Sequence, residues 1–512
     1  MWYLFWTGFH LFTSGVFMNL VSFLLSLSPV ALLAVLAVGL KQPALRLSLY
    51  GVIYTGILAF FTFKTPLMVI LWAVLDGVLS TIPLLLVVLA GILLSNLLLA
   101  SGSLSRLVAA FLPALGHPRQ RHLFIALGAC NFLEGASIIA EPLVAPMLWS
   151  AGVAPAGAAA LSIMGYAGMM SVEMAGIIIT VLALVTGLPQ VELAKAAAWL
   201  SVPATLALAA ALPMYLPKED GGLLLGLQTL ASALLISLVA LITTMALDVT
   251  LAGMTGGLAL MAVLLVRGCH RLTGGRQIVV DLAPFLLILI PLLLVNTVPH
   301  LRTLTLHYLV IEFKVIPVHR ITLTPFFSAY LYLFLALGLA LFLFRQKVPV
   351  SGVLTAGLRQ AWRALASMAL FGAMGQIIAF SGYGEGFGQL DKTHNIPWVL
   401  AMGLKNHTGQ LYPLFVPLLG WVGTFLTGYG VASLMLFGEL QVHAARLLGK
   451  SAVWLAAGLS VGASVGSISS PFKIAIATPM CGALGLEGEI LRRTIPLGLA
   501  ASFLLGLILW LL

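Results

Sequence analysis

Long stretches without any Asp, Glu, Lys or Arg constrain the fold of this 512-residue chain more than any other feature. A membrane-spanning helix needs about 20 predominantly apolar residues. Because lipid offers no partners for backbone amides, only helices or closed barrels can cross it. Barrel strands would appear as short alternating runs, whereas the stretches here are long and continuous, which favours helices. They are residues 77–105, 142–172, 196–217, 221–247, 282–301, 321–344, 364–384, 406–438, 451–472 and 494–512.

The overall composition agrees with a lipid environment. Charged residues make up 8% of the chain and hydrophobic residues 61%, whereas a soluble domain carries roughly a quarter charged residues. We therefore predict an all-α polytopic membrane protein with roughly 12 to 14 membrane segments, each about 20 residues long. No long polar stretch separates soluble domains, so residues 1–512 are expected to form one integral membrane domain.

Basic residues predict the orientation. The first 40 residues contain no Lys or Arg, so the charged start of a secretory signal is missing. We interpret the apolar run 17–40, followed by Lys41 and Arg46, as a first span that starts outside the cell. Cytoplasmic loops carry an excess of basic residues, so we expect a cell (inner) membrane location with two cytoplasmic loops, marked by Arg119 and Arg121 and by Arg267, Arg271 and Arg276. The net charge of +10 then needs no nucleic-acid partner.

Signatures of enzymes and cofactor sites are missing from the sequence. Cys130, Cys269 and Cys481 are isolated, which argues against a disulfide framework or a zinc site. The chain has no nucleophile elbow, HExxH motif or P-loop. We therefore expect neither an enzyme nor an ATP-driven pump, and neither a cofactor nor a bound metal.

An internal repeat predicts the architecture. The Phe-Leu-Glu-Gly sequence at 132–135 reappears as Phe-Leu-Thr-Gly at 425–428, and at the same offset Gly165 aligns with Gly458. Short Leu/Gly/Ala strings also recur by chance. A genuine repeat predicts two transporter halves, over approximately 125–190 and 418–490, with broken or re-entrant helices that meet near the membrane midplane.

Three glutamates at expected membrane depth are candidate proton carriers. An ionisable group in a span is costly and suggests function, and burial disfavours the charged form of a carboxylate, which suits it to take up a proton. The candidates are Glu134, Glu141 and Glu173. The alternatives are a structural pair with a neighbouring helix and, for Glu141 before Pro142, a cap of a helix start. Asp76, Asp248 and Asp281 stand at edges of apolar runs, where we expect a boundary role.

Lys473 is the candidate partner of a substrate anion. It lies two residues after Pro471, and its ammonium could neutralise a substrate carboxylate or pair with an embedded glutamate. The alternative is a lysine whose stem reaches to the membrane interface. Ser469 and Ser470, just before the proline, would present hydroxyls and free amides to an anion at a broken helix start; small residues that allow close helix packing are the alternative.

Several motifs resemble the lactate permease family. The matching stretches are 132–136 with Pro142, then 407–409, 417–423 and 425–428, and finally Gly466, 470–471 and 474–477. The resemblance implies uptake of lactate, glycolate or a similar 2-hydroxymonocarboxylate together with a proton. It also implies the inverted-repeat fold of the ion transporter superfamily, with two re-entrant hairpins and often a homodimer. With the residue arguments above, it gives a candidate substrate site of Asn131, Gly135, Thr427, Gly428, Ser433, Ser469, Ser470 and Lys473, with Glu134 as a proton carrier.

The chain departs from the family pattern inside these motifs. Residues 138–141, which end in Glu141, replace a Gly-Phe-Gly-Ala sequence, and Tyr166 with Ala167 replaces an Asn-Thr pair. A polar run after Gly428 is reduced to one aliphatic hydroxyl, that of Ser433, within 429–434. Ser467 stands where the family has a lysine, and Lys473 follows six positions later. A larger or more apolar acid therefore becomes a plausible substrate.

Three functions remain open from the sequence. Proton-coupled transport of a monocarboxylate accounts for the embedded charges. A membrane scaffold, assembly factor or receptor that has kept a transporter fold would account for the lost polar run. A passive anion channel is the third alternative, and it would show no acceleration of uptake by substrate on the opposite side.

Overall fold

The computed structural model describes residues 20–33, 35–36, 40, 42–217, 222–266, 268, 275–308, 310–346 and 348–512. This part of the chain is helical almost throughout, with one two-stranded sheet, which confirms the all-α polytopic membrane class. Within these ranges there are six apolar helices of 10–17 residues. In the described ranges, nine helices are long and apolar enough to cross a membrane: Ile82–Ala100, Gln190–Met214, Leu223–Ala246, Gly275–Thr297, Val350–Ala379, Ile396–Thr427, Gly430–Leu448, Ala452–Ser469 and Glu487–Leu511.

The two predicted cytoplasmic loops lie at the same end of the molecule. Gly268 packs directly against the backbone of Ala114, which lies five residues before Arg119. Two loops on the same side of the membrane would have to lie close together in this way. Lys41, Arg267, Cys269 and Arg271 lie outside the described residues, as do parts of the predicted span 17–40, of which the helix Leu20–Leu33 is described. The side of the membrane that each loop faces stays a prediction.

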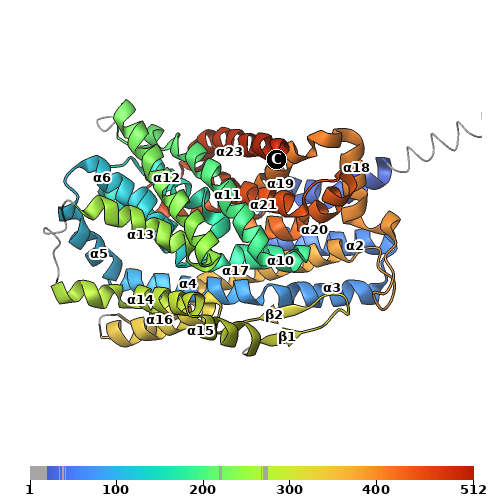
Figure 1. Cartoon of the computed structure of the whole chain (residues 1–512), viewed down its shortest axis with the longest axis horizontal. Coiled ribbons are helices and arrows are strands. Elements are labelled where there is room, and N and C mark those ends of the chain that lie inside the picture. Colours follow the sequence, from blue (N-terminus) through green and yellow to red (C-terminus); the bar gives the residue numbers. More distant parts are fainter. Residues whose placement is uncertain are drawn as a thin grey trace, which may run out of the picture.

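A layer of long helices forms one side of the molecule (Figure 1). It contains α2 (Ala44–Phe61), α3 (Leu67–Ser80), α4 (Ile82–Ala100), α14 (Gly275–Thr297), α16 (Ala329–Phe344) and α17 (Val350–Ala379). A Cβ atom on Gly77 of α3 would overlap the backbone of Gly372 and Ala373 on α17. Small residues allow such close approach of helices in a membrane protein, so these glycines hold α3 and α17 together at backbone distance.

The other side contains helices that are interrupted at the predicted motifs. In the first broken-helix region (residues 118–186), α6 (Pro118–Leu123), a π-helical turn and α7 (Cys130–Gly135) end before α8 (Glu141–Ser150), and α9 (Pro155–Ala167) is separated from α10 (Ile177–Thr186) by short 3₁₀ turns. In the second broken-helix region (residues 412–477), α19 (Tyr412–Thr427) breaks before α20 (Gly430–Leu448), and α21 (Ala452–Gly466) breaks before α22 (Pro471–Ala477). Each region thus has two interruptions in the same order; the symmetry that relates the halves stays a prediction.

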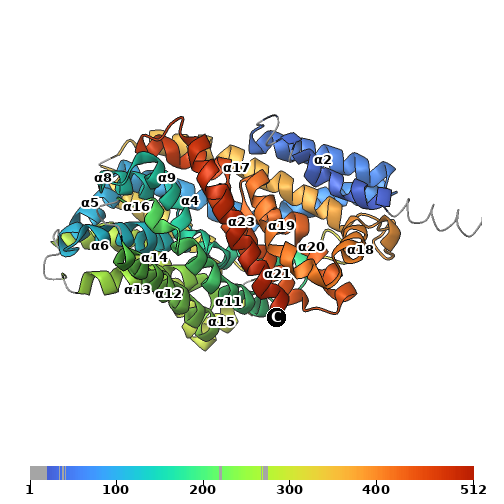
Figure 2. The same cartoon turned by 90° about the horizontal axis from the view of Figure 1, so that it is seen from above.

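The remaining elements surround these regions. Figure 2 shows α23 (Glu487–Leu511) crossing the molecule with α8 and α9 on one side and α19 and α20 on the other, and α23 contacts α9, α19 and α21. Helix α15 (Pro299–Thr303) is followed by a β-hairpin whose register pairs Glu312 with Thr322. The other bounds are α5 (Ser103–Phe111), α11 (Gln190–Ala209), α12 (Leu223–Ala246), α13 (Ala252–Leu265), α15 (Pro299–Thr303), β1 (Ile311–Phe313), β2 (Ile321–Leu323), α18 (Ile396–Thr408) and α23 (Glu487–Leu511).

The three aspartates at the edges of apolar runs all have polar partners. Asp76 is fully buried and contacts His319 at 2.8 Å. Asp281 is buried and accepts two hydrogen bonds from the guanidinium of Arg106 on α5, at 2.6 and 2.9 Å. Asp248 caps a short turn through the backbone N–H of Thr250. The sequence places these residues beside apolar runs but does not reveal that partners distant in the chain neutralise them.

Candidate functional site

The helix breaks of the two regions meet in the interior. The Ser467 hydroxyl, in the break between α21 and α22, donates to the sulfur of Met170, in the break between α9 and α10, at 3.0 Å. Nearby, the hydroxyls of Ser171 and Ser460 are 2.7 Å apart. Helix α22 also contacts α8 and α9. Backbone polar groups freed by helix breaks at membrane depth must be buried in protein or line a cavity, so this meeting point is the place where a polar site is tolerated.

Lys473 projects into this meeting point. Ser470 caps α22, and its hydroxyl accepts from the backbone N–H of Lys473 at 3.4 Å. The Lys473 ammonium donates to the Tyr166 hydroxyl at 2.5 Å and to Glu141 Oε1 at 3.4 Å. It also lies 4.8 Å from the centre of the Tyr166 ring, within range of a cation–π interaction. Lys473 is 8% exposed, so its side chain does not extend to a membrane interface.

Tyr166 links the ammonium to the carboxylate of Glu141. Its hydroxyl accepts from Lys473 and donates to Glu141 Oε1 at 2.6 Å. Glu141 is the first residue of α8, and its second oxygen, Oε2, has no hydrogen-bond partner among the described residues. The sequence indicates Tyr166 only as a departure from the family pattern, because an isolated tyrosine in an apolar helix carries no signal of its own. We call Glu141, Tyr166 and Lys473 the buried triad.

Glu134 and Glu173 lie close to the buried triad. Glu134 Oε1 accepts from the backbone N–H of Ala140 at 2.8 Å, across the break between α7 and α8. Glu173 is fully buried, and neither of its oxygens has a hydrogen-bond partner in the described part of the chain. The Glu173 side chain packs at Gly253 on α13, which also packs against Gly135 beside Glu134. The structure therefore brings all three candidate proton carriers to the candidate anion partner.

The hydroxyls of three predicted binding residues are engaged by the backbone. Thr427 donates to the Gly423 carbonyl at 2.7 Å, Ser433 to the Gly420 carbonyl at 3.0 Å, and Ser469 to the Thr494 carbonyl at 3.1 Å. Each bond stabilises a helix break or ties neighbouring helices together. A hydroxyl also carries acceptor lone pairs, so these residues can still accept a hydrogen bond from a ligand.

The predicted glycines and Asn131 shape the breaks. Gly428 has φ 85°, a conformation that favours glycine, and a Cβ there would press on Phe472 beside Lys473. Gly135 packs against the backbone of Gly253 on α13. The Asn131 amide donates to the carbonyls of Leu127 and Gly165, at 2.8 and 2.7 Å, and so ties α7 to α9.

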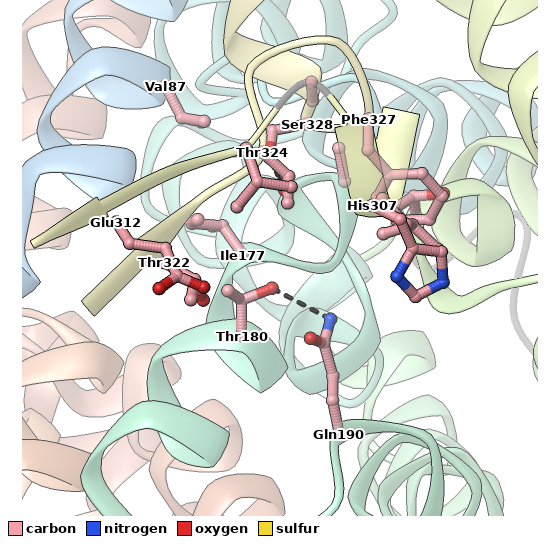
Figure 3. A pocket seen from close by; sticks show the side chains of 15 residues that line it. Val87, Ile177, Thr180, Gln190, His307, Glu312, Thr322, Thr324, Phe327 and Ser328 are labelled. Carbon is pink, nitrogen blue, oxygen red and sulfur yellow. Dashed lines mark hydrogen bonds between the residues drawn. The ribbon is translucent and has the colours of Figure 1, made fainter. Parts of the chain in front are cut away.

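A cavity of about 420 Å³ lies apart from the buried triad. It opens between α10, α11 and the β-hairpin (Figure 3), where Gln190 donates to Thr180 at 3.0 Å. Its lining includes Ala175, two residues after Glu173. The cavity thus extends to the break between α9 and α10. Tyr166 of the buried triad lies near the end of α9, before the same break.

Fold and site together define a class: a polytopic α-helical membrane protein whose interrupted helices meet around buried, paired charges. Within that class the chain belongs to the L-lactate permease family, because the family model described as "L-lactate permease" matches residues 22–512.

Individual relatives match over shorter segments. The L-lactate permease of Escherichia coli K12 is 35% identical over 136 residues, which cover 27% of this chain and 23% of the relative. The glycolate permease GlcA of the same organism is 39% identical over 101 residues, 20% of this chain and 18% of the relative. The L-lactate permease of Bacillus subtilis 168 is 36% identical over 110 residues, 22% and 19% of the two chains. The matched segments thus span about a fifth of the length of these relatives.

Proposed function

We propose that this protein is a secondary active transporter that moves a small monocarboxylate together with a proton across the cell (inner) membrane. The single observation that carries the proposal is the buried ammonium of Lys473, held by Tyr166 and Glu141 where the broken helices meet. A buried cation that is shared with a carboxylate at 3.4 Å can exchange that carboxylate for a substrate anion. The relatives, named lactate and glycolate permeases, favour a 2-hydroxy acid as the substrate.

Charge balance suggests the stoichiometry. One ammonium and three carboxyl groups share a buried region, and unpaired buried charges are strongly unfavourable. The region is neutral when two of the three carboxyl groups carry protons. A substrate monoanion that arrives at Lys473 adds one negative charge. The region then stays neutral only if the third carboxyl group also takes up a proton. One proton would therefore accompany each monocarboxylate, and transport would be electroneutral.

The lining of the site bears on the choice of acid. Met170 places its sulfur 3.9 Å from the Lys473 ammonium, and Tyr429 with Phe472 forms an aromatic pair, 4.8 Å between ring centres, beside Gly428. A thioether thus lies beside the charged partner of the substrate, and an aromatic pair includes Phe472, its neighbour in the chain. This lining is compatible with lactate or glycolate and also with a more apolar acid of similar size. Binding competition among such acids would rank them.

Uptake into sealed proteoliposomes tests the proposal. Radiolabelled acids from glycolate to longer 2-hydroxy and unsubstituted monocarboxylates are offered with and without an inward proton gradient. We expect gradient-driven accumulation of at least one acid and faster uptake when unlabelled acid is present on the opposite side. Accumulation that fails for every acid would favour a scaffold role, and uptake without acceleration from the opposite side would favour a passive anion channel.

An N-terminus outside and a homodimer remain predictions. Labelling of an N-terminal tag in intact cells would test the first, and mass measurement in detergent would test the second.

A further inference from the structure

The β-hairpin covers a cavity that leads toward Glu173. One wall of the cavity comes from the hairpin and the segment after it, through Glu312, Thr322, Thr324 and Ser328, and the other from the start of α10 and of α11 (Figure 3). At about 420 Å³ the cavity is large enough for several water molecules, each of which occupies about 30 Å³ in the liquid.

Part of the cavity lining, Ala175, belongs to the strained break between α9 and α10. Met174 and Ala175 have φ angles of 49° and 48°, and Gly176 has 75°. A positive φ is uncommon for residues other than glycine, and such strain gathers at functional sites. Glu173 directly precedes this segment, fully buried and with both oxygens unpartnered within the described ranges. Glu173 thus stands two residues before Ala175, which lines the cavity.

The chemistry of the lining favours water over the substrate anion. Its polar side chains are hydroxyls, one amide, one imidazole and one carboxylate; they belong to Thr180, Gln190, Thr250, His307, Glu312, Thr322, Thr324 and Ser328. Among the described residues that line it there is no Lys or Arg, so a substrate carboxylate would find no fixed positive charge and would meet Glu312. Water needs two to four polar partners, and this lining provides them.

His319 fixes the hairpin in its covering position. Its Nδ1 lies 2.8 Å from Asp76 Oδ2 on α3, and its Nε2 lies 3.1 Å from the Leu184 carbonyl on α10. A carbonyl only accepts, so Nε2 donates to it. The imidazole thus joins the loop of the hairpin to α3 of the long-helix layer and to α10 of the first broken-helix region.

We propose that this cavity is the water-filled path by which the transported proton reaches Glu173, separate from the route of the carboxylate. The inference rests on the proposed proton coupling and deepens it by assigning the proton its own entrance. In exchange of substrate for substrate the loaded carrier need not release its proton, whereas every cycle of net uptake requires the proton to enter and leave. Blocking the cavity should therefore stop net uptake and spare exchange.

Cysteine labelling separates these two readouts. In a background with Cys130, Cys269 and Cys481 replaced by alanine, Thr180→Cys and, as a second lining position, Thr324→Cys are treated with a membrane-impermeant, permanently charged methanethiosulfonate. Thr393→Cys is the matched control, since it lies in the exposed segment between α17 and α18, away from the cavity. Labelling, proton-driven lactate uptake and lactate exchange are then measured in the same proteoliposomes.

We expect both cavity cysteines to be labelled, with loss of proton-driven uptake and retained exchange, while the labelled Thr393→Cys protein keeps both activities. Absence of labelling at both cavity positions in active protein would overturn the inference. So would uptake and exchange that fall together, because the cavity would then be the route of the carboxylate. Untreated protein that exchanges lactate without accumulating it on a proton gradient would refute the proton coupling, and this inference with it. Normal coupling that survives labelling would refute this inference alone.

Discussion

Replacing Lys473 with methionine should weaken substrate binding strongly while leaving the fold intact. Methionine has nearly the length of the lysine side chain without the ammonium, so the change removes the charge-assisted hydrogen bond to a substrate carboxylate. Such bonds contribute about 1.5 to 3 kcal/mol. Because about 1.4 kcal/mol corresponds to a tenfold change in affinity, we expect binding of the carboxylate to weaken by about 10-fold to 100-fold.

The same change affects the unliganded protein, because it removes a partner of Glu141. Breaking a buried ion pair by removing one member typically costs about 3 to 5 kcal/mol. Here Glu141 keeps the hydrogen bond from Tyr166 at 2.6 Å, so we expect a cost at or below the lower end of that range. The double variant Lys473→Met with Glu141→Gln should regain part of that stability, because the unpaired carboxylate is gone, but it should not regain binding.

Equilibrium binding of radiolabelled substrate to purified protein in detergent measures the effect, with thermal unfolding of the same samples as the stability readout. Lys405→Met is the matched control, since Lys405 is exposed at the end of α18. Wild-type affinity in a well-folded Lys473→Met protein would refute the role of the ammonium. Equal loss in the Lys405→Met protein would show that the assay reports overall charge rather than the site.

Three further predictions concern neighbouring groups. Tyr166→Phe removes a neutral hydroxyl that bonds both Lys473 and Glu141; we expect weaker binding, by less than for Lys473→Met, in the same assay, and unchanged affinity would count against the triad. Glu173→Gln should abolish proton-driven uptake and spare exchange in proteoliposomes, with Glu192→Gln, near the start of α11, as the control; retained coupling would exclude Glu173 as a carrier. Burial alone would lower the pKa of His319, but its hydrogen bonds to Asp76 and Leu184 raise that pKa above its ordinary value. The charged contact therefore stabilises the hairpin fully below about pH 6.5, and this stabilisation is lost as pH rises through the raised pKa. Hydrogen exchange in residues 311–323, corrected for intrinsic rates, should therefore increase with pH. The same pH response in His319→Gln would contradict this.

The sequence predicts the helices better than it predicts their partners. Charge-free runs of spanning length depend on local composition alone, and they recover the membrane class. The breaks after Gly135 and at Gly428 and before Pro471 are also local in origin, because glycine and proline weaken a helix, although Pro284 and Pro291 lie inside α14. The β-hairpin at 311–323 was missed, since its strands are three residues long and too short to give an alternating pattern.

Local sequence patterns do not predict which residues pair across long distances in the chain. His319 and Asp76 are 243 positions apart, and Arg106 and Asp281 are 175 apart. Nothing in the neighbourhood of either aspartate indicates that it is buried and paired, so proximity to an apolar run suggested a boundary. The glutamates were easier to interpret, because an acid within an expected span implies a reason for its burial before any partner is known.

The departures from the family pattern gain meaning from where they meet. Glu141, Tyr166 and Lys473 are residues that the resemblance marks as departures from the family pattern, and they lie in three separate segments of the chain. In the structure they form one hydrogen-bonded set. A buried ammonium and carboxylate contribute weakly to stability, which favours a functional role for the set over a purely structural one. Under the proposed transport function, the joint change is what a carrier would need if its anion-binding cation moved to another helix position, since the relocated charge needs a carboxylate and a hydroxyl to balance it while no substrate is bound.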